Sequence, residues 1–105
     1  MENYEFYYKD VWERTLESIR NEDSYKIKEE DFYYFNGSRL YDCNDTLATI
    51  STPLEIGSIC LNGYKDIIAA HLSKILNKDL QIYIAPEKTL MPKRATGNRK
   101  TRVNS

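Results

Sequence analysis

The sequence predicts a small α+β domain in which the elements follow in the order α-α-β-β-α-β. Three observations support this prediction: two segments have apolar residues at helical spacing, a hairpin pattern lies between them, and an alternating segment follows the second. The chain has 105 residues, of which 41% are hydrophobic and 30% charged. This length and balance fit one globular domain with a single core.

The first helix is expected over residues 7–20, because its apolar residues fall on one face: Val11, Trp12, Leu16 and Ile19. A weaker second helix is expected over 27–35. Its acidic residues would lie near its beginning, where the helix dipole favours negative charge. The aromatic run Phe32–Phe35 could instead open a strand. Asn36-Gly37 ends this segment.

A β-hairpin is expected next, with strands at 39–43 and 46–51. Asn44 and Asp45 would form its two-residue turn, because both residue types tolerate positive φ. Thr52 is then expected to cap a third helix that has Pro53 at its first position. This helix is interrupted at Asn62-Gly63.

The strongest helical pattern follows over 64–77, and the segment Leu80–Ile84 alternates as a strand. Three strands then form one sheet that packs on helices on one face. The other face is expected to be polar and open to solvent or to a partner.

Charge divides the chain into an acidic body and a basic end. Residues 88–105 hold six basic residues and no acid, which leaves a net charge of −7 on residues 1–87. We therefore expect an interaction domain at 1–87 and a flexible basic tail at 88–105. The tail would either solubilise the protein or contact phosphates.

The sequence gives little indication of an enzyme. His71 is the only histidine, and neither Cys43 nor Cys60 lies in a Cys-x-x-Cys motif, so neither catalysis nor a zinc site is expected. The four glycines are scattered, and no cofactor is expected. No apolar run is long enough to span a membrane, and the N-terminus does not resemble a secretory signal. We therefore expect a cytoplasmic protein with reduced thiols.

Aromatic residues are unusually concentrated. Eleven of the thirteen lie in the first 41 residues. Most must belong to the core of so small a domain, but tyrosine and tryptophan are also favoured at protein interfaces and can stack on single-stranded bases.

Several segments in order resemble the N-terminal domain (domain I) of the bacterial replication initiator DnaA. They are Val11-Trp12-x-x-x-Leu16-x-x-Ile19, Asn44-Asp-Thr-Leu47, Thr49-Ile-Ser-Thr-Pro53, Tyr64-x-x-x-Ile68 and Asp79-Leu-x-Ile82. The resemblance covers about residues 9–87 and implies a KH-like fold. The Phe-x-x-Trp signature of the family's second helix is missing. We therefore expect a divergent or free-standing relative, as in a phage or mobile-element replication module, although an excised domain is the alternative.

The resemblance implies a protein–protein interaction module in replication initiation, which self-associates, recruits a helicase or other replication proteins such as a polymerase, primase or regulator, and contacts single-stranded DNA weakly. Trp12 would correspond to the self-association tryptophan, although it could equally be core. Ile56 would correspond to the apolar partner-binding residue, and Glu29 or Glu30 to an acidic one.

The alternative function is a small single-strand-binding accessory protein. Its basic contacts would come from the tail, and its stacking surfaces from exposed aromatic residues. The candidate residues are Lys93, Arg94, Arg99, Lys100, Arg102, Tyr34 and Tyr83.

Overall fold

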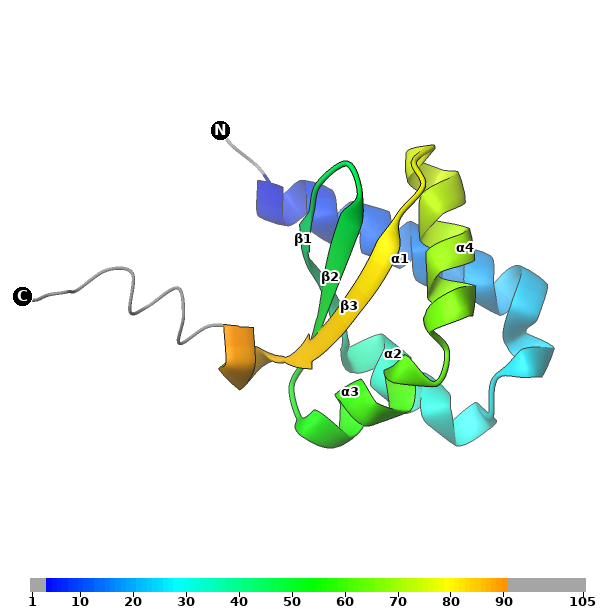
Figure 1. The fold of residues 1–105 in the computed structure, drawn as a ribbon. Coiled ribbons are helices and arrows are strands. Elements are labelled where there is room, and N and C mark those ends of the chain that lie inside the picture. Colours follow the sequence, from blue (N-terminus) through cyan, green and yellow to red (C-terminus); the bar gives the residue numbers. More distant parts are fainter. Residues whose placement is uncertain (1–3, 91–105) are drawn as a thin grey trace, which may run out of the picture.

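The computed structural model describes residues 4–90 and confirms the α+β class. The helices and strands follow in the order α-α-β-β-α-α-β, with two short 3-10 turns before the second helix (Figure 1). In chain order the elements are α1 (Tyr4–Asp23), η1 (Ser24–Lys26), η2 (Glu29–Asp31), α2 (Phe32–Gly37), β1 (Arg39–Cys43), β2 (Leu47–Thr52), α3 (Glu55–Asn62), α4 (Lys65–Leu76) and β3 (Gln81–Pro86).

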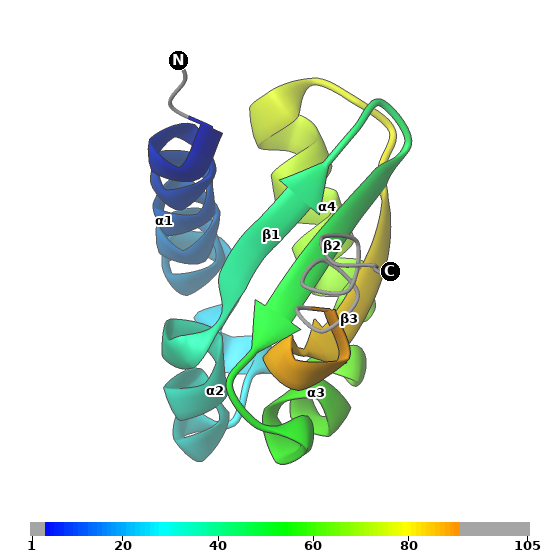
Figure 2. The same cartoon turned by 90° about the vertical axis from the view of Figure 1, so that its left-hand side faces the viewer.

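The sheet has the order β1-β2-β3 and is mixed. β1 pairs antiparallel with β2, and β3 pairs parallel with β2, so that Ile50 lies opposite both Leu40 and Ile84. Helices α1 to α4 lie behind and beside the sheet in Figure 2, while its other face turns to the viewer. One face is therefore covered by helices, as the sequence predicts.

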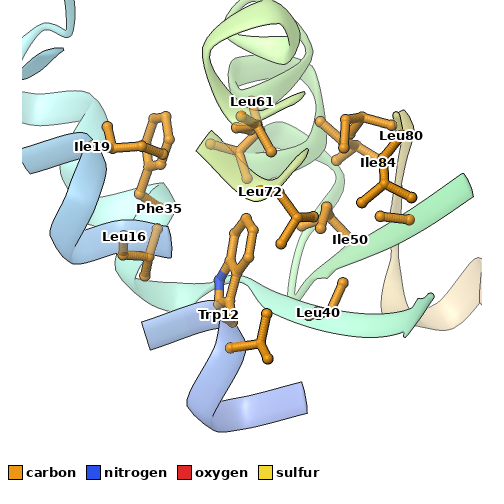
Figure 3. Close-up of a cluster of buried hydrophobic side chains, with 14 of the residues drawn as sticks. Trp12, Leu16, Ile19, Phe35, Leu40, Ile50, Leu61, Leu72, Leu80 and Ile84 are labelled. Atoms are coloured by element: carbon orange, nitrogen blue, oxygen red, sulfur yellow. The ribbon is translucent and has the colours of Figure 1, made fainter. Parts of the chain in front are cut away.

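The core lies between this covered face and the helices (Figure 3). Alternate strand residues point into it, and one side of each longer helix closes it. The labelled members in Figure 3 are Trp12, Leu16, Ile19, Phe35, Leu40, Ile50, Leu61, Leu72, Leu80 and Ile84. Each predicted helix and strand contributes to this one cluster, so residues 7–86 form a single packed unit.

The second helix differs from the prediction. The segment expected as one helix over 27–35 contains the 3-10 turn η2, and the α-helix begins only at Phe32. Phe32–Phe35 is thus helical and does not open a strand. The acidic residues Glu29, Glu30 and Asp31 do precede the helix, as the dipole argument predicts.

The hairpin turn is one residue later than predicted. Cys43 pairs with Ala48, and Asn44 N donates to Leu47 O, which leaves Asp45 and Thr46 as the loop. Among the described non-glycine residues only Asn77 has positive φ, so the expected conformation at Asn44 and Asp45 was wrong. The Asn44 side chain stabilises the turn instead, because its Oδ1 accepts from the backbone N–H groups of residues 46 and 47.

The predicted cap of the third helix was also wrong. α3 begins at Glu55 after Leu54, so Pro53 lies outside the helix. Thr52 Oγ1 donates to Leu54 O at 2.8 Å and lies 2.6 Å from Ser58 Oγ. This buried hydroxyl pair fixes the chain between β2 and α3. α3 and α4 are separated at Asn62-Gly63, as predicted.

Candidate partner-binding surface

α3 presents its apolar residues to two opposite sides. Gly57, Ser58 and Leu61 are buried, so they identify the side of this helix that faces the core. Ile56 and Ile59 lie three residues apart on the opposite side and are 55% and 67% exposed. Leu54, directly before the helix, is 67% exposed. We call these three residues, Leu54, Ile56 and Ile59, the α3 apolar surface.

α2 packs against the buried side of α3, at Gly57. The Tyr34 ring lies 3.4 Å from the position that a Cβ on Gly57 would occupy, so the missing side chain permits the close approach. Tyr33 meets Tyr34 edge to face, with ring centroids 5.3 Å apart, and is itself exposed. The two neighbouring tyrosines therefore differ: Tyr34 helps to hold the helices together, and Tyr33 faces solvent.

An acidic segment is fixed beside α3 by Tyr64. The Tyr64 hydroxyl donates to Asp31 Oδ2 at 2.5 Å and accepts from Lys28 N at 3.3 Å. Burial, together with the nearby Asp31, raises the pKa of the Cys60 thiol on α3 to about 11. A thiol with so high a pKa is a poor nucleophile at neutral pH. The exposed Glu29 and Glu30 belong to the acidic segment that Tyr64 holds through Asp31.

The structure places Trp12 in the core. Its side chain is 3% exposed, and its Nε1–H donates to Ser38 Oγ at 3.1 Å. A buried tryptophan with its one polar group satisfied cannot contact a partner without opening the fold. The interpretation of Trp12 as core thus fits the structure, and its assignment as an association residue does not.

The two candidate stacking tyrosines are not brought together. Tyr34 is half-buried between α2 and α3, whereas Tyr83 is 47% exposed on the uncovered face of the sheet. That face is less polar than predicted, because Leu47 is also exposed there. The other nucleic-acid candidates, Lys93, Arg94, Arg99, Lys100 and Arg102, lie outside the described residues. Residues 87–90 are helical, and this short helical stretch includes the first three residues of the predicted tail.

Sequence reasoning missed a hydrogen-bonded group between α1 and α4. His71 is buried, its Nδ1 lies 2.7 Å from Ser18 Oγ, and its Nε2 lies 2.7 Å from Asp23 Oδ2. These residues are 53 and 48 positions from His71, so no local pattern could have paired them. Serine, histidine and aspartate can form a catalytic relay, but the hydroxyl here lies within a helix whose backbone N–H groups are already bonded. The α1 backbone around Ser18 therefore offers no free N–H group to an oxyanion.

The described part of the chain contains no cluster of three or more acidic, histidine or cysteine side chains placed to hold a metal ion. Within the same part, no helix has the length and hydropathy to cross a membrane. Comparison with protein-family models gives no match, and comparison with curated proteins gives no significant match. The fold and exposed surfaces together define a small α+β domain whose most distinctive feature is the α3 apolar surface.

Proposed function

We propose that this protein is a protein–protein interaction module that docks its partner on the α3 apolar surface. The observation that carries the proposal is the exposure of Leu54, Ile56 and Ile59 at the start and along one side of a single short helix. Single exposed apolar residues are common on protein surfaces, whereas a group of neighbouring exposed apolar residues often marks an interaction site. Tyr33, exposed on the neighbouring helix α2, is of a residue type that is enriched in interfaces.

The more specific proposal is a role in the initiation of DNA replication, in the manner of the DnaA N-terminal domain. Its support is the resemblance in sequence together with the α-α-β-β order and the position of Ile56. Ile56, which by the resemblance would correspond to the family's partner-binding position, is one of the three exposed residues of this surface. A helicase, primase, polymerase or regulator of replication is the corresponding partner class.

The residues in and around the α3 apolar surface indicate which kind of partner it would bind. An apolar centre accepts aliphatic or aromatic anchors, while Glu55 on α3 and the acidic segment with Glu29 and Glu30 favour basic residues at the rim. Rim charges change the rate of association more than the affinity. Binding should therefore become slower at higher salt, while the apolar contacts determine how long the complex lasts.

The test measures binding of the purified protein to the replicative helicase and the primase of the same host by fluorescence anisotropy. Ile56→Asp and Ile59→Asp should each weaken binding at least tenfold, because a charge is placed in a contact that excludes water. Leu47→Asp changes an exposed apolar residue on the sheet and serves as the matched control. Equal binding by all variants, or no binding by the wild type, contradicts the proposal.

A second candidate function is weak binding of single-stranded DNA, which is favoured by the exposed ring of Tyr83. Deleting residues 91–105 should remove most of the affinity and flatten its salt dependence, because basic residues release counterions from phosphates. Anisotropy of a labelled oligonucleotide at low and physiological salt measures both effects. Tyr83→Ala tests the domain's own contribution. Absence of binding by the full chain at low salt would exclude this function.

A further inference from the structure

Among residues 4–90, β3 is an edge strand with unpaired backbone groups. It pairs with β2 on one side only, and Figure 2 shows no ribbon alongside its other edge. Gln81 N donates to Thr46 O, so residues 81, 83 and 85 turn their backbone groups toward β2. The N–H and C=O groups of Ile82 and Ile84 therefore point away from the sheet. An edge of this kind can pair with another strand.

The unpaired donors are restricted to these two residues. Before them, Leu80 N donates to Ser73 Oγ at 3.1 Å. After them, Pro86 has no N–H to donate. The free donors thus lie at equal distances on either side of Tyr83. A pattern that is symmetric about one residue can pair with itself when a second copy runs antiparallel.

The side chains of this edge do not oppose such pairing. Natural edge strands are commonly protected by lysine, by other charged residues or by bulges. β3 reads Gln-Ile-Tyr-Ile-Ala-Pro and has no charged residue, and its pairing with β2 is regular throughout. The other edge strand, β1, contains Arg39, Asp42 and an irregularity between Leu40 and Asp42. The contrast favours β3 as the edge that pairs.

The geometry points to a homodimer in which β3 pairs antiparallel with β3 of a second copy, about a twofold axis at Tyr83. Ile82 of each copy then exchanges both backbone hydrogen bonds with Ile84 of the partner subunit. The two Tyr83 residues lie directly opposite each other as a non-hydrogen-bonded pair, with their half-exposed rings on the uncovered face. The three-stranded sheets join into one sheet of six strands.

The residues of the α3 apolar surface lie outside β3, so they take no part in the strand pairing itself. Two copies of that surface in one particle would allow a multimeric partner to be bound by both at once. The interface itself is narrow, since it consists of one short strand from each copy. We therefore expect a reversible dimer, whose share of the protein rises with the protein concentration.

The first test uses the whole chain in sedimentation equilibrium over a range of concentrations. The wild type should show a monomer–dimer equilibrium, and Tyr83→Lys should weaken it about fivefold, because it places like charges directly opposite each other. Tyr25→Lys, at an exposed position on η1, is the control and should leave the equilibrium unchanged. A wild type that stays monomeric at every concentration overturns the proposal.

The second test fixes the register by disulfide formation under mild oxidation. Tyr83→Cys should cross-link, because directly opposite residues of this kind have Cα atoms about 4.5 Å apart, within the range that a disulfide spans. Gln81→Cys, also on the exposed face of β3, should not, since its two copies would be about 14 Å apart along the strands. Equal cross-linking of the two variants, or a dimer that Tyr83→Lys does not weaken, shows that the copies associate elsewhere and overturns the proposal.

Discussion

His71 Nε2 lies 2.7 Å from Asp23 Oδ2 and so joins the middle of α4 to the last residue of α1. The other ring nitrogen, Nδ1, lies 2.7 Å from Ser18 Oγ one turn earlier on α1. When Nε2–H donates to the carboxylate, Nδ1 is free to accept from the serine hydroxyl. The buried imidazole then has both nitrogens satisfied, which explains how a polar side chain is accommodated between two packed helices.

The Asp23 carboxylate should make the stability of the protein depend on pH. The hydrogen bond from His71, with a smaller contribution from Lys26, lowers the pKa of Asp23 below its usual value. Because the native pKa is below the unfolded one, this stabilisation is present above about pH 4 and is lost as the pH falls further. Asp23→Asn should therefore flatten the acid side of the plot of urea midpoint against pH. Asp45→Asn, at an exposed loop carboxylate, is the control and should retain the wild-type slope; equal slopes for both variants would contradict the assignment.

Trp12→Ala should unfold or severely destabilise the protein, because it removes a large side chain from the centre of the core. We expect a loss of about 3–5 kcal/mol in the free energy of unfolding. Trp12→Phe retains most of the volume but loses the hydrogen bond to Ser38, so its cost should be about 1–3 kcal/mol. Urea unfolding followed by far-UV circular dichroism measures both. A Trp12→Ala variant with the stability of the wild type would show that this indole is not a core residue.

Two glycine substitutions should have opposite effects. A Cβ on Gly37 would lie 3.9 Å from its nearest neighbour, so Gly37→Ala should raise stability by about 0.4–1 kcal/mol by restricting the unfolded chain. A Cβ on Gly57 would lie 3.3 Å from Thr52 Cβ, which belongs to a strand and cannot move aside. Gly57→Ala should therefore lower stability by about 1 kcal/mol despite its better helix propensity. Thermal unfolding of the two variants provides the comparison, and a stabilised Gly57→Ala would disprove the tight contact.

Asn77 ends α4 in the left-handed conformation, with φ 55° and ψ 47°. The N–H of Lys78 reaches back to the carbonyl of Ser73 at 3.0 Å, a common way to close a helix. Asn77→Gly should preserve or raise stability, whereas Asn77→Val should cost about 1–2 kcal/mol because a branched side chain clashes in this conformation. Differential scanning calorimetry would detect the difference. Similar melting temperatures for both variants would contradict it.

Local patterns were sufficient for most of the fold. The helical face with Trp12 and Ile19, the alternation of β3 and the break at Asn62-Gly63 each depend on residues a few positions apart, and each prediction is confirmed. The sequence was less informative where competing local signals coexist. Between residues 24 and 37 the acidic and aromatic runs fit several conformations, and packing of Phe35 and Ile27 into the core decides among them.

The candidate site was predicted only in part. The family resemblance pointed to Ile56, but Leu54, Ile59 and Tyr33 were not identified as exposed. α3 carries apolar residues around most of its circumference, so its sequence does not reveal which side meets the core. The contact of Gly57 with α2 and β2 settles that orientation.

The sequence by itself therefore determined the order and type of most of the elements, because helices and strands follow from spacings of two to four residues. The tertiary structure alone decided which side chains are buried, which backbone edge is unpaired and which residues meet. His71 illustrates the reason: its partners Ser18 and Asp23 are 53 and 48 residues away, and only the packing of α4 on α1 brings the three together. Contacts at such separations depend on the whole fold, and no segment of the chain encodes them alone.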